Sequence, residues 1–149
     1  MRLKPKKKLG QNFLIDKNII KKICNFTYID KNTDILEIGP GTGSLTEELL
    51  NKKPKKFYLI EKDKNLFENL KEKFPNKVNI FNDDILTFPL EKILSNRTIV
   101  FGNLPYNISS KILTKFILNH DNYKFKLLIF MFQKELANRI VAKINKSDY

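Results

Sequence analysis

The chain has 149 residues, 42% of them hydrophobic, which is enough for one domain with a buried core and excludes wholesale disorder. Its 28 basic and 16 acidic residues give a net charge of +12, which favours a polyanionic partner. A single cysteine excludes an internal disulfide bond, and a single histidine leaves no ligand set for zinc, so we expect no metal.

The N-terminus is strongly basic, with eight Lys or Arg residues and one Asp among residues 1–22. Residues 1–10 are expected to form a basic arm that contacts phosphates or, alternatively, stays a solvated tail. No secretory apolar segment follows, and the longest apolar run, Leu127–Phe132, is too short to span a bilayer. These features predict a cytoplasmic protein without a membrane partner. The lysines of the arm are Lys4, Lys6, Lys7 and Lys8.

Short apolar runs alternate with amphipathic stretches along the rest of the chain. Strands are predicted at Asp34–Ile38, Lys56–Ile60, Val78–Phe81, Thr98–Phe101 and Lys126–Phe132. Helices are predicted near Asp16–Phe26, Ser44–Asn51, Lys64–Phe74, Ser109–Asn119 and Lys134–Ile144. This order indicates an α/β fold with a doubly wound, mostly parallel sheet, in which ligands bind beyond the carboxyl ends of the strands.

The first strand leads into a loop with glycine at three alternate positions, Gly39, Gly41 and Gly43. Without Cβ atoms, such a loop lets the backbone approach a ligand closely. A dinucleotide-binding loop would carry its third glycine where this chain has Ser44. This departure favours a single nucleoside and disfavours an NAD-dependent oxidoreductase.

The next two strand ends are acidic. Glu61 lies 22 residues after Gly39, where a carboxylate can accept from both hydroxyls of a ribose, although a solvent-facing acid is the alternative. After the third strand, Asp83 or Asp84 could accept from an adenine amino group while Ile85 packs on the ring. Capping of a helix is the alternative for either Asp. Taken together, the three strand ends predict an adenosine-based cofactor, and with the chemistry of the fourth strand end they point to an adenosine-based methyl donor.

The fourth strand ends in Asn103-Leu104-Pro105-Tyr106. The Asn103 amide oxygen and the Leu104 carbonyl can accept two hydrogen bonds from one exocyclic NH2 group, and the Tyr106 ring can stack on the base that carries it. Such a loop suits an enzyme that modifies an amino group on a base turned out of its stack. A plain turn at a strand end is the alternative.

These motifs together resemble those of the S-adenosylmethionine-dependent rRNA adenine N6-dimethyltransferase family, in particular its small-subunit (16S) branch. Further matches are Gln11-Asn12-Phe13-Leu14, Gly102–Ser110 and Met131–Glu135, so the resemblance runs from about Lys8 to the end. It implies a Rossmann-like class I methyltransferase fold of about seven strands, five of which are predicted here. Residues 1–149 would then be one S-adenosylmethionine-binding domain, incomplete at its C-terminus and lacking a helical domain.

The resemblance also implies roles for individual residues. The catalytic loop would be Asn103, Leu104, Pro105 and Tyr106. Asp84 is favoured over Asp83, and the basic arm would contact RNA. The implied cofactor contacts are Gln11, Asn12, Leu14, Gly39, Gly41, Gly43, Glu61, Lys62, Asp84, Ile85 and Asn103.

Small-subunit rRNA or the pre-ribosomal small subunit is the implied partner, with each adenine methylated twice. The strand Leu127–Phe132 is expected to form an apolar sheet edge that favours self-association. Three alternatives stay open: a large-subunit (23S) adenine methyltransferase, a DNA adenine methyltransferase, and a non-catalytic RNA-binding or ribosome-assembly module. The stretch Met131–Glu135 argues against the 23S type.

Overall fold

The computed structural model describes residues 14–142. Within this range the strands are β1 (Asp34–Ile38), β2 (Lys56–Ile60), β3 (Asn79–Phe81), β4 (Thr98–Asn103) and β5 (Leu127–Met131). The helices are α1 (Lys17–Cys24), α2 (Ser44–Leu50), α3 (Lys64–Lys73), α4 (Ser109–Leu118) and α5 (Lys134–Val141), with a 3-10 turn η2 (Leu90–Lys92). All five strands and five helices were therefore predicted, whereas η2 was not.

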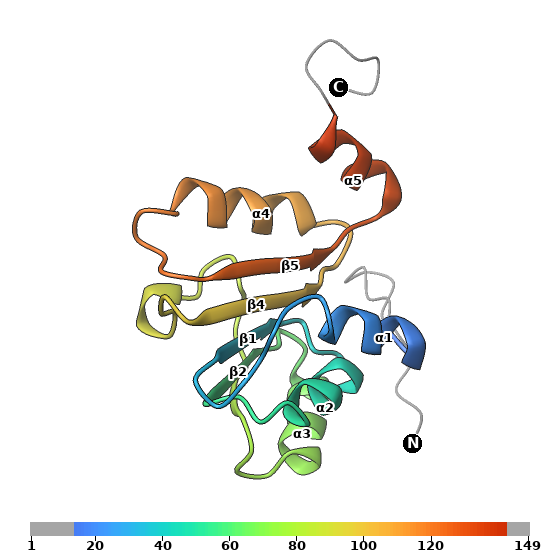
Figure 1. The fold of residues 1–149 in the computed structure, drawn as a ribbon, viewed down its shortest axis with the longest axis vertical. Helices are drawn as coiled ribbons and strands as arrows, with labels where there is room; N and C mark the ends of the chain where they lie inside the picture. The colour runs from blue at the N-terminus through green and yellow to red at the C-terminus, as the bar shows by residue number, and fades with distance from the viewer. Residues whose placement is uncertain (1–13, 143–149) are drawn as a thin grey trace.

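The five strands form one sheet in the order β3-β2-β1-β4-β5, and every neighbouring pair is parallel. The prediction of a doubly wound sheet is confirmed, and the sheet is wholly rather than mostly parallel. The strand order reverses between β1 and β4, which places a ligand-binding crevice at their carboxyl ends. In Figure 1 these ends lie on the right, where the chain turns from β4 into α4.

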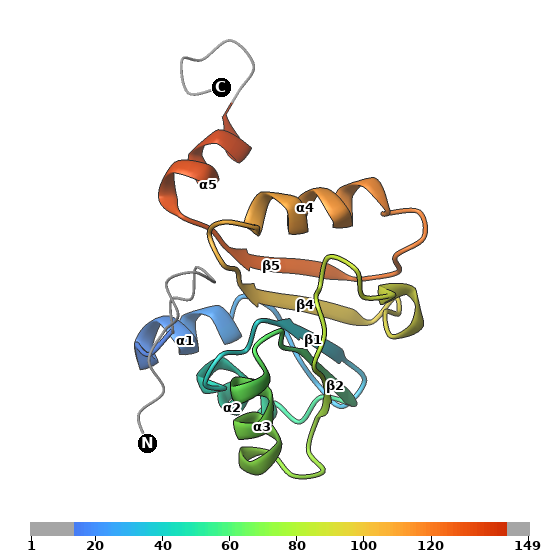
Figure 2. The ribbon, with the colours of Figure 1, turned by 180° about the vertical axis from the view of Figure 1, so that it is seen from behind.

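Helices cover both faces of the sheet (Figures 1 and 2). Buried apolar residues from each of α1, α2 and α3 pack with one set of strand side chains, including Ile35 and Phe101. On the other face, α4 and the segment from residue 85 to 94 pack on Leu36, Ile60 and Val100. Because β1 is covered on both faces, all five of its residues are buried, including Asp34 and Glu37.

The lone cysteine serves the core. Cys24 is 1% exposed, and burial raises the pKa of its thiol to about 12. The thiolate is therefore strongly disfavoured at neutral pH. Cys24 is therefore a small core residue rather than a nucleophile.

The glycine loop between β1 and α2 has a left-handed backbone, with φ of 63° at Gly39, 60° at Gly41 and 79° at Gly43. A Cβ atom at Gly39 would meet no atom within 4 Å, whereas one at Gly43 would lie 2.6 Å from Cε2 of Phe74. Gly39 therefore faces open space, and Gly43 allows α2 to approach α3 closely.

We expect Gly43→Ala to lower the free energy of unfolding by about 3 kcal/mol, because backbone strain and a clash with the Phe74 ring add together. Gly39→Ala is the matched control and should cost about 1 kcal/mol, because only the strain applies. Denaturant unfolding of both variants measures the difference. Equal losses would show that Phe74 yields and that the close approach at Gly43 is not restrictive.

Strand β5 lies at the end of the sheet order, and within residues 14–142 only β4 pairs with it. Helix α5 follows it and buries none of its residues; Ile140 and Val141 are exposed. The predicted apolar edge is thus present in the described part of the chain, while self-association through it stays a prediction. Among the described helices, none has the length and apolarity needed to cross a membrane.

Candidate functional site

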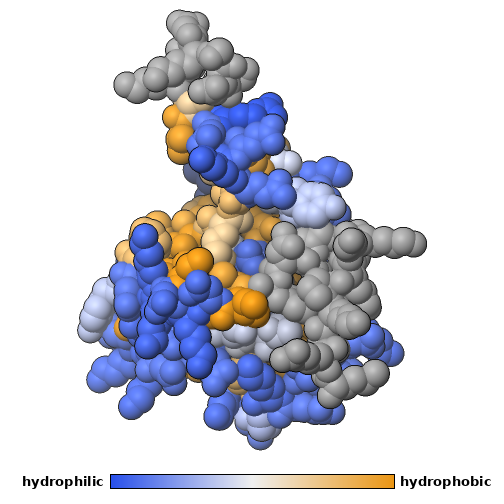
Figure 3. Space-filling view, turned by 90° about the vertical axis from the view of Figure 1, so that its right-hand side faces the viewer, coloured by the Kyte–Doolittle hydropathy of each residue, from blue (hydrophilic) through white to orange (hydrophobic). Residues whose placement is uncertain are grey.

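A cavity lies beyond the carboxyl ends of β1, β2, β3 and β4. Figure 3 looks onto this side of the molecule, where an apolar area is flanked by hydrophilic side chains. The cavity brings together the ends of four strands and the start of α4, as the doubly wound topology requires. Its lining consists of Ile38, Gly39, Gly41, Ile60, Glu61, Lys62, Asp63, Leu66, Asp83, Asp84, Ile85, Asn103, Pro105, Asn107, Ile108 and Ile112.

Glu61 is the buried acid of this cavity, with 5% of its surface exposed. Its Oε2 accepts a hydrogen bond from the Gly41 amide at 3.2 Å, and its Oε1 accepts one from the Asp63 amide at 2.9 Å. Burial raises the pKa of Glu61, although these amide hydrogen bonds oppose the rise. A carboxylate has about four acceptor sites, so Glu61 can support the glycine loop and still accept from two ligand hydroxyls. The alternative of a solvent-facing acid is wrong.

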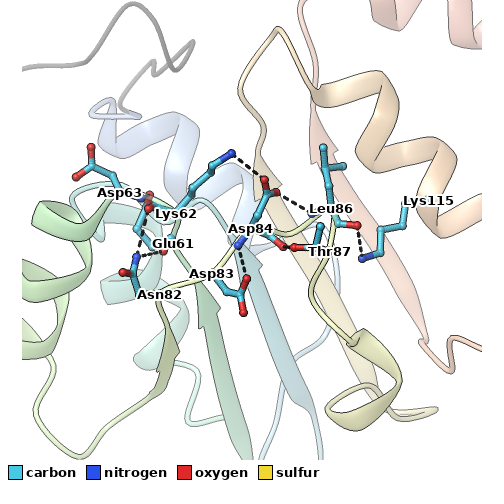
Figure 4. A network of polar contacts seen from close by, with 9 residues as sticks. All are labelled: Glu61, Lys62, Asp63, Asn82, Asp83, Asp84, Leu86, Thr87 and Lys115. Atoms are coloured by element: carbon cyan, nitrogen blue, oxygen red, sulfur yellow. Dashed lines mark hydrogen bonds and ion pairs between the residues drawn. The ribbon is translucent and has the colours of Figure 1, made fainter.

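Asp84 and Lys62 face each other from the ends of β3 and β2 (Figure 4). Lys62 Nζ lies 2.7 Å from Asp84 Oδ2, while Asp84 Oδ1 accepts from the Leu86 amide at 2.9 Å. Burial acts to raise the pKa of Asp84, but the hydrogen bond and charge of Lys62 outweigh it and hold the pKa below its usual range. Asp84 therefore both stabilises its own turn and presents an ionised carboxylate at the cavity.

Apolar side chains form the walls between these polar groups. Ile38, Ile60, Leu66, Ile85 and Ile112 all line the cavity, and each is buried. The side chains of isoleucine and leucine can pack against the face of an aromatic ring but form no hydrogen bonds. The arrangement therefore suits a heterocyclic base held between apolar walls, with its polar edge directed at a carboxylate such as Asp84.

The loop after β4 closes the cavity on its other side. Asn103 is the last residue of β4 and, with Pro105, lines the cavity. The Leu104 side chain is buried and packs over Gly102, where a Cβ atom would lie only 2.5 Å from its Cδ2. Tyr106 is 52% exposed and does not itself line this cavity, although its chain neighbours Pro105 and Asn107 do, so its ring is accessible beside the cavity.

A second, smaller cavity adjoins the first and contains a residue that the sequence analysis missed. It is lined by Glu37 together with Leu14, the glycine loop, Ser44, Leu45 and Asn103. Glu37 Oε2 accepts from Thr46 Oγ1 at 2.7 Å. Burial raises the pKa of Glu37 to about 8, the Thr46 hydrogen bond opposes this rise, and the charge of Glu61 adds to it. An acid inside an apolar strand directly before the glycine loop was the pattern that could have revealed it.

Glu37 should make the stability of the chain depend on pH. In the unfolded state the Glu37 carboxyl has its ordinary pKa of 4.5, whereas in the folded state its pKa is about 8. The free energy of unfolding therefore falls as pH rises between these two values. In the parent, the free energy of unfolding should fall by on the order of a few kcal/mol across this window. We expect Glu37→Gln to remove this pH dependence, because glutamine cannot ionise. Chemical denaturation at pH values across the window measures it. Parallel pH profiles of the variant and the parent would contradict the assignment.

The structure thus brings most of the predicted site residues together. Gly39, Gly41, Glu61, Lys62, Asp84, Ile85, Asn103 and Pro105 line the larger cavity, and Leu14 lines the smaller one. Gly43, Leu104 and Tyr106 line neither cavity, and Gly43 instead lies against Leu70 and Phe74. The predicted contacts that lie outside the described residues are Gln11, Asn12, Lys4, Lys6, Lys7 and Lys8.

Comparison with known proteins shows what this arrangement is similar to. The family model for ribosomal RNA adenine dimethylase matches residues 2–149. Ribosomal RNA small subunit methyltransferase A of Pelagibacter ubique (strain HTCC1062) is 53% identical over all of this chain and 57% of its own length.

Two solved structures share the fold. A dimethyladenosine transferase from Plasmodium falciparum superposes with a TM-score of 0.79 and 30% identity, over 93% of this chain and 49% of that one. The 23S rRNA methyltransferase ErmE gives a TM-score of 0.73 and 27% identity, over 86% of this chain and 50% of that one. The predicted methyltransferase fold is therefore confirmed. The chain spans about half the length of each of these three proteins.

Proposed function

Because the chain belongs to the ribosomal RNA adenine dimethylase family, we propose that it binds S-adenosylmethionine and takes part in methylating the N6 amino groups of adenines in small-subunit rRNA. The observation that carries the proposal is the convergence of three strand ends on one cavity. Glu61, the Asp84–Ile85 pair and the Asn103–Pro105 loop all line it. Each supplies a group that an adenosine-based cofactor or an adenine substrate requires.

The residues of the two cavities fit this cofactor. Gly39 leaves space that a Cβ would fill, and Glu61 keeps acceptor capacity for ribose hydroxyls. Asp84 and Ile85 stand next to apolar walls that suit adenine. Glu37 and Leu14 line the adjoining cavity, where a charged amino-acid tail would meet a buried acid. When bound, the cofactor supplies an activated methyl group on a sulfonium.

On the substrate side, this chain would act by orientation. The adenine N6 lone pair is delocalised into the ring, so the amine is a poor nucleophile. Acceptors at the Asn103 side chain and the Leu104 carbonyl would hold the two N6 hydrogens and favour a pyramidal nitrogen. The exposed Tyr106, next to the lining residues Pro105 and Asn107, would stack on the base, a contact of about 1–3 kcal/mol. Proximity and orientation then supply most of the rate, and no strongly basic side chain is needed.

Several finer points belong to the same proposal. Gln11 and Asn12 are proposed to contact the cofactor, Gly43 to assist indirectly by holding the glycine loop against α3, and the lysines of residues 1–10 to contact RNA. The cytoplasm is the proposed location, where the pre-ribosomal small subunit would be the partner. The name and 53% identity of the Pelagibacter relative support the small-subunit substrate over the large-subunit one.

The test is nucleoside mass spectrometry after incubating the chain and S-adenosylmethionine with small-subunit RNA, large-subunit RNA or DNA. We expect N6,N6-dimethyladenosine in the small-subunit RNA alone. Methylation confined to large-subunit RNA or DNA would favour those alternatives. Tight RNA binding without methylation by a chain that binds the cofactor would favour the ribosome-assembly module.

A further inference from the structure

Lys115 on α4 makes an unusual set of contacts on the opposite side of the Asp84 turn from Lys62 (Figure 4). Its Nζ donates to the carbonyl oxygens of Ile85 at 2.8 Å, Leu86 at 3.0 Å and Phe88 at 2.9 Å. An ammonium group has three N–H donors, so these three acceptors use its full capacity. Lys115 is thereby committed to the loop that follows β3.

The loop depends on such a partner because it lies outside the sheet. Its own backbone bonds run from the Thr87 and Phe88 amides to the Asp84 carbonyl and from the Leu90 amide to the Phe88 carbonyl, whereas the Ile85 and Leu86 carbonyls accept from Lys115. Burial lowers the pKa of Lys115, whereas the charges of Glu91, Asp84 and Asp83 act to raise it. The acidic surroundings therefore help to keep a partly buried ammonium group charged.

Both ends of this connection reach the candidate site. Ile85, on the loop, lines the larger cavity, and so does Ile112, which precedes Lys115 by one helical turn on the same side of α4. Helix α4 begins at Ser109, whose Oγ donates to the Tyr106 carbonyl at 3.2 Å. Lys115 thus links the wall that contains Asp84 and Ile85 to the helix that continues from the Asn103–Tyr106 loop.

We propose that Lys115 is a positioning residue that holds the adenine-binding wall of the cofactor site against α4 and thereby couples cofactor binding to the loop for the substrate base. The inference deepens the proposed function and rests on it. Lys115 touches neither cofactor nor substrate in this scheme. Lys115 would affect the binding of cofactor and substrate indirectly, through the positions of Ile85 and Ile112.

The test compares Lys115→Met, which keeps the aliphatic stem but has no N–H donor, with Lys111→Met, an exposed lysine one turn earlier on α4. The ligands are S-adenosylhomocysteine and 5′-methylthioadenosine, which share the adenosine part but differ in the amino-acid tail. Calorimetry gives the two affinities, and backbone hydrogen exchange of the ligand-free chain reports on residues 84–88. Lys115→Gln, with a shorter side chain and two N–H donors, provides a second variant if the first does not fold.

We expect Lys115→Met to weaken the binding of both ligands by the same factor, about tenfold, because only the wall that contacts their common adenine loses its support. Exchange at residues 84–88 should accelerate selectively, Lys115→Gln should be intermediate, and Lys111→Met should match the parent. Unchanged affinity with faster exchange throughout the chain would overturn the proposal, because Lys115 would then be only a stabilising residue. If the parent binds neither ligand, the proposed function fails as well, whereas exchange at residues 84–88 still decides whether Lys115 holds the loop.

Discussion

Replacing Asn103 by alanine should abolish most methyl transfer while leaving a folded chain that still binds the cofactor. Asn103 ends β4 and lines both cavities, so its side chain stands where cofactor and substrate would meet. Without its amide oxygen, one of the two acceptors that orient the N6 amine is lost. We expect the rate of transfer to fall by at least about a hundredfold, as for the loss of one preorganised polar group in other active sites.

The measurement is single-turnover methylation of small-subunit RNA at saturating S-adenosylmethionine, so that the rate of transfer is separated from binding. Asn69→Ala is the matched control, because Asn69 is an exposed residue of α3 and alanine is well tolerated in helices. Cofactor and RNA affinities of Asn103→Ala should change little in comparison with the rate. A variant with an unchanged rate would show that the Asn103 side chain does not hold the amine.

Replacing Glu61 by alanine should remove most of the affinity for the cofactor. Glu61 is buried at the end of β2, and its carboxylate already accepts from the Gly41 and Asp63 amides. The substitution removes the acceptors for the ribose hydroxyls and also releases the glycine loop. Hydrogen bonds to charged groups contribute about 1.5–3 kcal/mol each, so we expect the Kd to rise by at least about a hundredfold.

Calorimetric titration with S-adenosylmethionine measures this change. Glu61→Gln keeps the size of the side chain and should lie between the parent and Glu61→Ala; Glu68→Ala, at an exposed position on α3, should behave as the parent. Burial raises the pKa of Glu61, so this carboxylate takes up a proton at a higher pH than an exposed glutamate does. The affinity of the parent for S-adenosylmethionine should therefore fall as the pH is lowered through this raised pKa. A Kd of Glu61→Ala within about twofold of the parent would remove Glu61 from the site.

Local patterns were sufficient to predict the elements of the fold. The alternation of apolar strands and amphipathic helices carries its own periodicity, which is why β1 and β2 occur at the residues predicted from sequence. The site residues at strand ends followed from the same logic, because parallel strands present their carboxyl ends at one edge. Gly43 shows the limit of this logic: its spacing matched that of Gly39 and Gly41, but its structural partner, Phe74, directly follows α3 and is distant in sequence.

Residues whose role depends on contacts distant in sequence were not predicted. Glu37 directly precedes the glycine loop in sequence, but its burial depends on the cover of both faces of β1 and its hydrogen-bond donor, Thr46, comes from α2. Lys115 appeared as one more lysine on an amphipathic helix, since its three carbonyl partners lie 27 to 30 residues earlier. Neither the burial of Lys115 nor its three acceptors follow from a local sequence pattern, so the structure was needed to recognise them.

The central claim is that the ends of β1, β2, β3 and β4 form one cofactor site, and a backbone NMR titration of the chain with S-adenosylmethionine tests it most directly. We expect saturable, one-to-one shifts of the amide signals of Gly39, Gly41, Lys62, Ile85 and Asn103, all with the same Kd. Shifts confined to other regions of the sheet, or no shifts in a chain with the dispersed spectrum of a folded protein, would contradict the claim.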